Sequence, residues 1–587
     1  MPTVTYDHAT LRDIQARFDI EHDRFLWEAS LSDIGCVVEE CTAETVEIEV
    51  FPDRPDLLSP ETMAHAARPF LHRTEAVNHL PTTDGDVAMT VDASLAEVRP
   101  IILGAVVRGV DTGATPEANE AFIQDLMDHQ EKLHFSIGRR RRRASIGVHD
   151  LAQLLPPFRV VTVPETYAFT PLAMTERMSI REILESHPKG VDYAHLLDGF
   201  SAFPVILDAG DRVLSFPPII NGDHTTVTAS TTDFFIDVTG WDARACEASL
   251  LLVCLSLAAR GGTVETIALT DCHGAESRSP NGGPLVHELP ARLLAEILGR
   301  EFTDAELREA INRMGGRFIE GRTVTDGPLE ATRMADAAIG EKVYRIEMPR
   351  WRADILHPVD LVEEVATGIG YEDLGAALSG QSKAGIPLAS THLHRRIRES
   401  LQANGLQQVT SLTLSNEEDQ FTKVRLTPPA EVTGLHNPIT VDHTIMRQSV
   451  LPSLLNLLAA NRHHELPQRV YELGAVVRDH HNANRAAWAC AEVGGGFTAA
   501  KGLAGALLRD LGAVAREIEV RYEALTPEDG GPFLAGRGAK VIVAGEWVGC
   551  VGEIDPAVSA SFGLKVPIQA GEWDVDALGR LIPDPIL

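Results

Sequence analysis

Four carboxylates stand close together in the second half of the sequence. Asp360, Glu363 and Glu364 occupy positions i, i+3 and i+4, and Asp354 comes shortly before them. Residues at that spacing share one face of a helix, so their charges repel unless a cation or an arginine neutralises them. Mg²⁺ takes oxygen ligands and usually keeps waters beside a few carboxylates. The spacing therefore indicates a candidate magnesium site.

The same spacing has a second interpretation. Acidic side chains are favoured in the first turn of a helix, where they accept hydrogen bonds from free backbone N–H groups and meet the positive end of the helix dipole. Asp360 and Glu363 fit that role as well as metal binding. From the residues alone, both interpretations stay open.

The elements that must position this cluster follow from hydrophobic periodicity and from turn residues. A strand over 343–348 leads through 349–352 into a helix over 360–368. Elsewhere the pattern predicts a polar linker at 81–86, helices over 60–72, 117–133, 243–260, 304–314, 394–404 and 451–461, and strands over 99–110, 159–163, 234–238, 409–414 and 469–477. The expected fold class is α+β with several domains.

Length and composition bound the possible classes of protein. A chain of 587 residues suggests three to five domains, at roughly 150 residues each. The net charge is -32, and of 52 basic residues only 8 are lysine. An acidic, lysine-poor chain fits a high-salt cytosol, and a GC-rich genome that favours arginine codons explains the composition equally well. The scattered cysteines, with no Cys-x-x-Cys, indicate neither zinc nor disulfides. Without an apparent signal peptide or spanning segment, we expect a cytoplasmic protein with no membrane partner.

The segment PRWRADILHPVDLVEEVATGIGY, residues 349–371, closely resembles the end of a small middle domain in phenylalanine–tRNA synthetase beta subunits. In that family the corresponding acids form a magnesium site near the contact with the alpha subunit. The resemblance thus implies Mg²⁺ as a cofactor, held by Asp354, Asp360, Glu363 and Glu364.

The resemblance extends over nearly the whole chain. FPDRPDLLS at 51–59 is similar to the family's N-terminal signature, and the segments at 137–151, 203–221 and 235–242 resemble its archaeal and eukaryotic editing domain. The implied domains are an N-terminal α/β domain at 1–85, an editing domain at 86–275, a small helical and β middle domain at 276–375, and a final module at 376–587.

The final module resembles the antiparallel-sheet core of class II synthetases, with Arg447 where an arginine is common. It lacks the Gly-x-Gly-x-x-x-Arg helix start that an active class II enzyme uses for ATP. The resemblance therefore implies a catalytically silent copy that packs against the alpha subunit. ATP would be bound mainly by alpha, in an assembly of two alpha and two beta chains that charges tRNA(Phe).

An editing site is needed because tyrosine differs from phenylalanine by one hydroxyl, which an apolar pocket rejects only about 10²-fold. The family's editing pocket maps onto Leu207, Ser215, Asp237 and Thr239, and Asn221 is a further candidate. Asp237 and Thr239 fall on one face of a strand, and Asp237 could accept a hydrogen bond from the tyrosine hydroxyl. As alternatives, a strand-end cap explains Asp237 and an Asn-Gly turn explains Asn221.

Five consecutive arginines, Arg139, Arg140, Arg141, Arg142 and Arg143, stand out in this acidic chain. Such a run often forms a solvated face. Arginine also suits phosphate binding and base stacking, so the run is a candidate tRNA contact. The competing hypothesis for the whole chain is a non-catalytic RNA-binding or assembly subunit that has lost editing.

Overall fold

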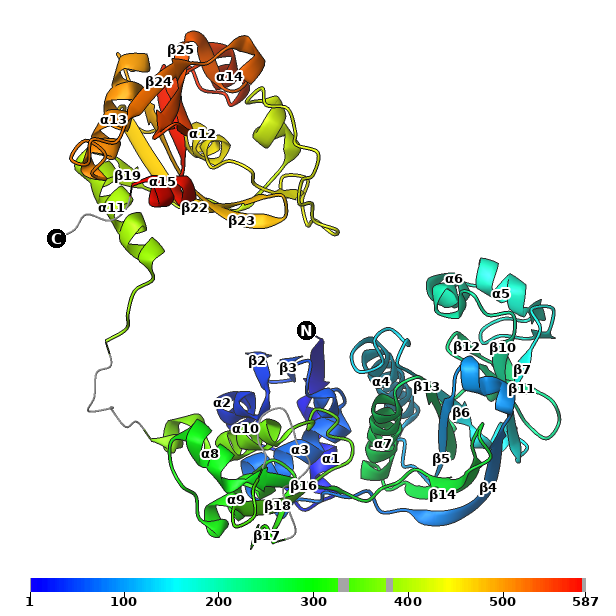
Figure 1. The fold of residues 1–587 in the computed structure, drawn as a ribbon. Helices are drawn as coiled ribbons and strands as arrows, with labels where there is room; N and C mark the ends of the chain where they lie inside the picture. Colours follow the sequence, from blue (N-terminus) through cyan, green and yellow to red (C-terminus); the bar gives the residue numbers. More distant parts are fainter. Residues whose placement is uncertain (1, 326–336, 376–383, 583–587) are drawn as a thin grey trace. The chain divides into compact units, whose positions relative to one another are not determined.

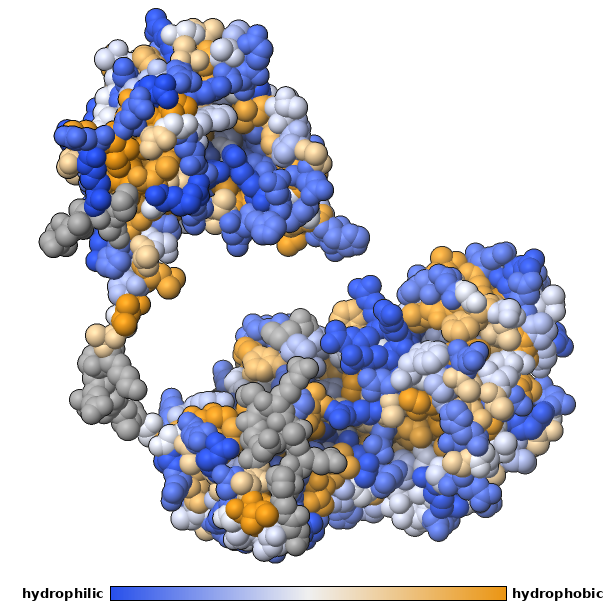
Figure 2. All heavy atoms as spheres, viewed as in Figure 1, coloured by the Kyte–Doolittle hydropathy of each residue, from blue (hydrophilic) through white to orange (hydrophobic). Residues whose placement is uncertain are grey.

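A computed structural model describes residues 2–325, 337–375 and 384–582. The chain divides into two compact units, Met1–Leu378 and Ser379–Leu587. Figure 1 shows both as mixtures of helices and sheets, which confirms the mixed, multidomain class. Figure 2 shows hydrophilic side chains over most of the visible surface of each unit, in keeping with the net charge of -32. No helix in the described ranges is both long and apolar enough to cross a bilayer.

The first unit begins with a small sheet in the order β1-β3-β2, covered by helices. Its elements are β1 (Thr3–Asp7), α1 (His8–Ala16), α2 (Arg24–Ser30), β2 (Cys36–Cys41), β3 (Thr45–Val50) and α3 (Pro60–His72). Helix α3 has the predicted bounds because the Ser59 hydroxyl caps it and Pro60 occupies its first turn.

The central part of this unit is a large mixed sheet in the order β12-β11-β10-β7-β4-β14-β5-β13-β6, with β15 beside β14. Its strands are β4 (Thr83–Val91), β5 (Ile101–Arg108), β6 (Ala144–Asp150), β7 (Phe158–Val163), β10 (Phe203–Leu207), β11 (Val213–Phe216), β12 (Ile220–Asn221), β13 (Phe234–Gly240), β14 (Thr263–Thr270) and β15 (Glu276–Ser279). The predicted linker at 81–86 is wrong from residue 83 onward, because Thr83 and Asp84 already pair with β14 in strand β4.

Helices α4 (Pro116–Phe135) and α7 (Ala243–Ala259) pack on one face of this sheet (Figure 1). Helix α7 is buried on nearly all sides, because it also packs against α3 of the N-terminal part. The Ser59 and Ser256 hydroxyls are hydrogen-bonded at 2.9 Å where those helices meet. Smaller elements complete the region: β8 (Ala168–Phe169), β9 (Met178–Ser179), α5 (Ile180–Ser186) and α6 (Pro188–Tyr193).

The last part of the first unit is a sheet in the order β16-β18-β17 beside three packed helices. Its elements are β16 (Leu285–Pro290), α8 (Ala291–Leu298), α9 (Asp304–Arg313), β17 (Arg317–Thr323), β18 (Lys342–Met348) and α10 (Pro358–Ile369). Helix α10 starts two residues before the predicted position, because Pro358 has the backbone angle of a first helical turn.

The second unit is built on an antiparallel sheet in the order β19-β22-β23-β27-β26-β25-β24, in which only β19 runs parallel to its neighbour. Its elements are α11 (Ala389–Ala403), β19 (Gln407–Gln408), β20 (Leu414–Ser415), β21 (Ile445–Met446), α12 (Leu451–Ala460), β22 (Gln468–Arg478), β23 (His481–Ala491), α13 (Phe497–Asp510), β24 (Val520–Ala524), β25 (Phe533–Val543), β26 (Glu546–Ile554), α14 (Pro556–Ser561), β27 (Ile568–Asp574) and α15 (Val575–Leu581). Separate apolar clusters fill its two faces.

The predicted strand at 409–414 is wrong over most of its length. The backbone of Val409 donates to the Tyr471 carbonyl, whereas the Ser411 N–H and hydroxyl both donate to the Glu472 carboxylate. A side-chain acceptor thus takes the place of a neighbouring strand, so the backbone leaves the sheet after Gln408.

Two sets of buried ion pairs lie side by side where the N-terminal part of the first unit meets its last part. The guanidinium of Arg352, which is 4% exposed, donates to Asp354 and Glu364, both at 2.6 Å. Arg54 pairs with Asp56 at 2.8 Å beside it, and these residues line one small cavity with Arg352. Burial acts against the charge of Arg352, but Asp354 and Glu364 outweigh it and raise its pKa. The segments at 51–59 and 349–371 therefore meet in space.

We expect Arg352→Met to lower the stability of this unit by about 3–5 kcal/mol, because it leaves the buried Glu364 and the partly buried Asp354 without their partner. Urea unfolding measures the loss. Arg317→Met is the matched control, since Arg317 binds Glu347 at 2.7 Å but is solvent-exposed; its effect should stay within about 1 kcal/mol. Equal effects of the two variants would show that the buried network adds no special stability.

Candidate functional site

A pocket of about 220 Å³ opens in the central sheet region, between α4, β6, the β11–β12 turn and β13. We call it the central pocket. It is lined by apolar side chains, such as Ile123 of α4, and by many polar groups, among them Ser145, Ser215, Asn221 and Asp237. A cavity that combines apolar surface with convergent polar groups is the usual form of a small-molecule site.

Asp237 lies in the middle of β13, between β5 and β6, and is 1% exposed. It is therefore not the strand-end cap that its sequence context allowed. Its neighbours across the sheet are Gly104 and Gly147, so no side chain competes for the space beside its carboxylate. A Cβ at Gly147 would lie 2.0 Å from Asp237 Oδ2. Gly147 thus makes room for the buried acid.

His149 fixes the orientation of that acid. Its Nε2–H donates to Asp237 Oδ2 at 2.7 Å, and its Nδ1 is hydrogen-bonded to the Thr225 hydroxyl at 2.9 Å. Among the described residues, none donates to Asp237 Oδ1, so this oxygen is the one available to a bound molecule. The strand ASIGVHD carried a signal for His149, because alternation puts Ser145, Gly147 and His149 on one face.

Ser215 and Asn221 also line the central pocket. They face each other across the β11–β12 pair, where the Ser215 hydroxyl donates to Asn221 Oδ1 at 3.2 Å. Asn221 thus belongs to a short strand, and its side chain takes part in the pocket wall. Because this serine already has a partner and both His149 nitrogens are engaged, Ser215 and His149 do not form a nucleophile–base pair in this pocket.

Thr239 and Leu207 lie outside the lining of the central pocket. Thr239 is fully buried behind Ser145, accepts a hydrogen bond from Arg99 Nε at 2.7 Å and bonds the Ser145 hydroxyl at 2.9 Å. Leu207 packs in the apolar cluster of β10. Both support the walls of the pocket, and their predicted contact with substrate stays a prediction.

Sequence reasoning missed a cluster of charges in the lining of the central pocket. Glu131 of α4 pairs with Arg141 at 2.6 Å and lies 3.7 Å from Lys189. The close approach of His134 Nδ1, at 3.5 Å, opposed by burial and aided by Arg141, lowers the pKa of Glu131 to about 2. No short motif in the sequence marks these residues, which come from separate elements.

The arginine run divides into two kinds of residue. Arg141 is buried, and its Nη1 donates to the carbonyls of Pro218 and Ile219 at 3.1 and 2.9 Å. It is a structural residue of the pocket wall. The other members, Arg139, Arg140, Arg142 and Arg143, are exposed in the turn that follows α4. The exposed members leave cationic groups facing solvent near the same pocket.

The acidic cluster is only partly free. Arg352 engages two of its members, Asp354 and Glu364. Asp360 Oδ2 accepts from the backbone N–H groups of Leu356 and His357, both at 2.7 Å, so the capping interpretation is confirmed for this residue. Partial burial, followed by Asp53, Asp360 and Asp354, raises the pKa of Glu363. Glu363 therefore lies among acidic neighbours, of which Asp354 is paired with Arg352.

Only part of this cluster, Asp360 and Glu363, is suited to hold Mg²⁺. Within 2–325, 337–375 and 384–582, no three His, Cys, Asp or Glu side chains gather in a metal-binding arrangement. Asp360 and Glu363 each keep oxygens that Arg352 does not engage. Two carboxylates with several waters suit Mg²⁺, whereas Asp354 and Glu364 would have to release Arg352 to bind it.

Comparisons with known proteins agree along the chain. Three family models match: "B3/4 domain" at residues 98–252, "tRNA synthetase B5 domain" at 287–371 and "Phenylalanyl tRNA synthetase beta chain CLM domain" at 377–575. The central pocket lies in the first of these ranges and the acidic cluster in the second.

Curated relatives match over nearly their full lengths. The phenylalanine–tRNA ligase beta subunit of Methanothrix thermoacetophila is 38% identical over 93% of this chain and 94% of its own. That of Methanococcoides burtonii is 35% identical over 98% and 100%. Among solved structures, an N-terminal fragment of the Pyrococcus horikoshii phenylalanyl-tRNA synthetase beta subunit matches with a TM-score of 0.54 and 26% identity, over 63% of this chain and all of the fragment.

We expect Gly147→Ala to displace the Asp237 carboxylate from His149 and to destabilise the chain by about 1–3 kcal/mol through overpacking. Thermal unfolding and the imidazole NMR signals of His149 report the two effects. The control is Gly502→Ala on α13, where an added Cβ meets nothing within 4 Å and should stabilise by up to about 1 kcal/mol. Unchanged His149 signals in Gly147→Ala would contradict the close packing of this glycine against the carboxylate.

Proposed function

The chain belongs to the family of phenylalanine–tRNA ligase beta subunits, and we propose that its central pocket hydrolyses Tyr-tRNA(Phe). With an alpha subunit it would form Phe-tRNA(Phe) from phenylalanine, ATP and tRNA(Phe), in a complex of two alpha and two beta chains. Adenylation and most ATP binding would belong to alpha. The observation that carries the editing proposal is the buried Asp237, oriented by His149, with one oxygen facing the pocket.

This arrangement suits selection of tyrosine over phenylalanine. A buried carboxylate oxygen without a partner costs free energy until a donor reaches it, and the tyrosine hydroxyl is such a donor. Phenylalanine would leave the oxygen unpaired. A site built to bond a hydroxyl discriminates far more strongly than an apolar pocket that must exclude one. The pocket volume of about 220 Å³ fits an amino-acid side chain.

The hydrolytic step then needs a positioned water rather than a protein nucleophile. Ser215 is held by Asn221, and both ring nitrogens of His149 already have partners. We therefore assign Ser215 and Asn221 to orienting the water and the aminoacyl ester, together with hydroxyls of the RNA. Water would attack the ester carbonyl, and the 3′-terminal ribose oxygen would leave with a proton.

We expect Asp237→Ala and Ser215→Ala, each assembled with the alpha subunit, to slow deacylation of Tyr-tRNA(Phe) at least about tenfold. Aminoacylation with phenylalanine should stay unchanged, since it uses another site. Asp198→Ala is the control, because Asp198 is exposed and outside the central pocket. If both pocket variants edit at the wild-type rate, the site is elsewhere. If wild-type chain does not edit although the complex charges tRNA, a non-catalytic assembly subunit is the correct alternative.

The exposed arginines Arg139, Arg140, Arg142 and Arg143 provide a cationic approach for the tRNA acceptor end in a chain of net charge -32. Replacing Arg140 and Arg142 with Gln should weaken tRNA binding and reduce its salt dependence by about one unit of slope for each phosphate that is no longer neutralised. A binding titration over several salt concentrations measures both. An unchanged slope would make the run a solvated face.

The acidic cluster is proposed as a magnesium site in which Asp360 and Glu363 bind the ion. Asp354 and Glu364 lie near it but are paired with Arg352. The ion would neutralise the surplus negative charge at the start of α10. The final module, with its antiparallel sheet, is proposed as a class II-like copy that packs against alpha without catalysis.

We expect Mg²⁺ to raise the melting temperature of the wild-type chain, because an ion that binds only the folded state stabilises it. Asp360→Asn should abolish that shift while keeping an oxygen that caps α10. Asp304→Asn, at the start of the neighbouring helix α9, is the control and should keep the shift. A melting temperature independent of Mg²⁺ in the wild type would reduce the cluster to its capping and ion-pair roles.

A further inference from the structure

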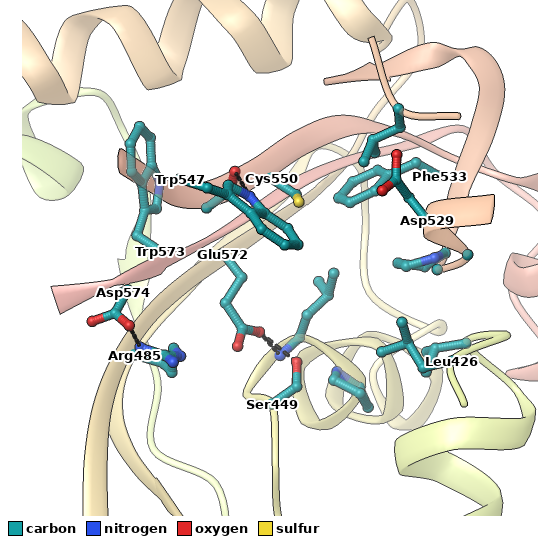
Figure 3. Close-up of a pocket in the computed structure, with 18 of the residues that line it drawn as sticks. Leu426, Ser449, Arg485, Asp529, Phe533, Trp547, Cys550, Glu572, Trp573 and Asp574 are labelled. Atoms are coloured by element: carbon teal, nitrogen blue, oxygen red, sulfur yellow. Dashed lines mark hydrogen bonds and ion pairs between the residues drawn. The ribbon is translucent and has the colours of Figure 1, made fainter. Parts of the chain in front are cut away.

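The second unit contains a cavity that the editing function does not use. It measures about 280 Å³ and lies between the face of the antiparallel sheet, the start of α12 and the loop before β25. We call it the module pocket. Figure 3 shows Glu572, Cys550 and Trp547 on the sheet side and Ser449 at the start of α12. Its volume lies just below the roughly 300 Å³ at which drug-sized sites begin, so its ligand must be small.

The wall of the module pocket is largely apolar. Its apolar lining includes Leu426, Leu451, Pro452, Leu525, Phe533 and Trp547. Burial raises the pKa of the Cys550 thiol to about 11, so this side chain adds a neutral surface at physiological pH. An apolar side chain of a ligand would therefore be removed from water here, which is favourable.

Most charges around the module pocket are already paired. Arg485 binds Asp574 at 2.6 Å, and Asp529 binds Lys540 at 2.5 Å. Two charged residues, Arg478 and Glu572, form no ion pair with another described residue. The pocket thus offers one cation and one anion to a ligand.

Arg478 keeps donors for an anion. Its Nε donates to the Gln448 carbonyl at 3.2 Å, and its two terminal nitrogens have no hydrogen-bond partner in the described part of the chain. Burial of its side chain and the nearby Arg485 lower its pKa, and Glu572 and Asp574 act in the opposite direction. A guanidinium with incomplete neutralisation favours a carboxylate, which it can bind through two nitrogens.

Glu572 keeps one acceptor for a cation. Its Oε2 accepts from the Ser449 hydroxyl at 2.5 Å and from the backbone N–H groups of Val450 and Leu451 at 3.1 and 2.9 Å. Figure 3 shows the Glu572 carboxylate directed at the start of α12. Those bonds hold the carboxylate in place at the start of α12. No described residue donates to Oε1, which leaves a fixed anionic oxygen on the pocket wall.

We propose that the module pocket binds a free α-amino acid with an apolar side chain. The ligand carboxylate binds the terminal nitrogens of Arg478, its ammonium binds Glu572 Oε1, and its side chain packs against Leu451 and Phe533. A zwitterion satisfies both charges with one small molecule, whereas a nucleotide or a simple anion leaves Glu572 opposed by negative charge. This site is separate from the central pocket, in the other compact unit.

Isothermal titration calorimetry of the full-length chain without alpha tests the proposal, with L-leucine, L-methionine and L-phenylalanine as probes. At least one should bind saturably, and its amide and N-acetyl forms should bind about tenfold more weakly or worse, because each lacks one charge. Arg478→Gln should cause a similar loss. Glu572→Gln should do so too while keeping an oxygen for Ser449 and α12.

The matched control is Arg521→Gln, an exposed arginine of the same sheet outside the module pocket, which should bind like the wild type. Circular dichroism melting of each variant confirms that it is folded. Absence of saturable binding to all three amino acids, equal affinity for the charge-blocked forms, or undiminished binding by folded Arg478→Gln would each overturn the proposal. Binding of ATP in place of amino acids would do the same.

Discussion

The buried guanidinium of Arg352 is the interaction on which the organisation of the first unit depends. It engages carboxylates on the loop before α10 and on α10 itself, and it lies beside the Arg54–Asp56 pair of the N-terminal segment. Buried charges are tolerated only when each has a partner. Each guanidinium has its carboxylate partner within its own segment, and the two sets of pairs pack around one small cavity, so segments about three hundred residues apart in sequence bury each other's charges.

The pairing with Arg352 also changes how the acidic cluster is interpreted. Spacing alone made four carboxylates look like equivalent ligands. In the folded chain they differ, because Arg352 engages two of them, one caps a helix and Glu363 retains surplus negative charge. A cation that used Asp354 and Glu364 would have to displace the guanidinium, whereas Asp360 and Glu363 are not engaged by it. The oxygens that stabilise the fold are therefore different from those left open to a ligand.

Sequence patterns predicted the elements whose signals are local. Ser59 and Pro60 fixed the start of α3, and the glycines after α9 fixed its end. The sequence patterns gave wrong predictions where the hydrogen-bond partner of a segment lies far away in sequence. Residues 83 and 84 are polar but pair with β14, and the segment after Gln408 bonds the side chain of Glu472 instead of a strand. No local pattern contains those partners.

The candidate site was predictable to the same extent. The family resemblance led to Asp237 and Ser215. The alternation of residues along Ala144–Asp150 places His149 on the same face as Ser145. The sequence could not predict that Thr239 lies outside the pocket lining. In the folded chain Ser145, which is hydrogen-bonded to Thr239, lines the pocket in its place. Glu131, Arg141 and Lys189 meet from separate elements, so their cluster appears only after folding.

Arg141 ties one wall of the central pocket to the other, since it bonds the Pro218 and Ile219 carbonyls as well as Glu131 of α4. The cavity is consequently preorganised: its shape is set before any substrate arrives. A ligand that enters it loses its own freedom but does not have to order the protein around it, so little binding energy is spent on loop entropy. Selectivity in such a rigid recess comes from fit to a fixed template rather than from closure around the substrate.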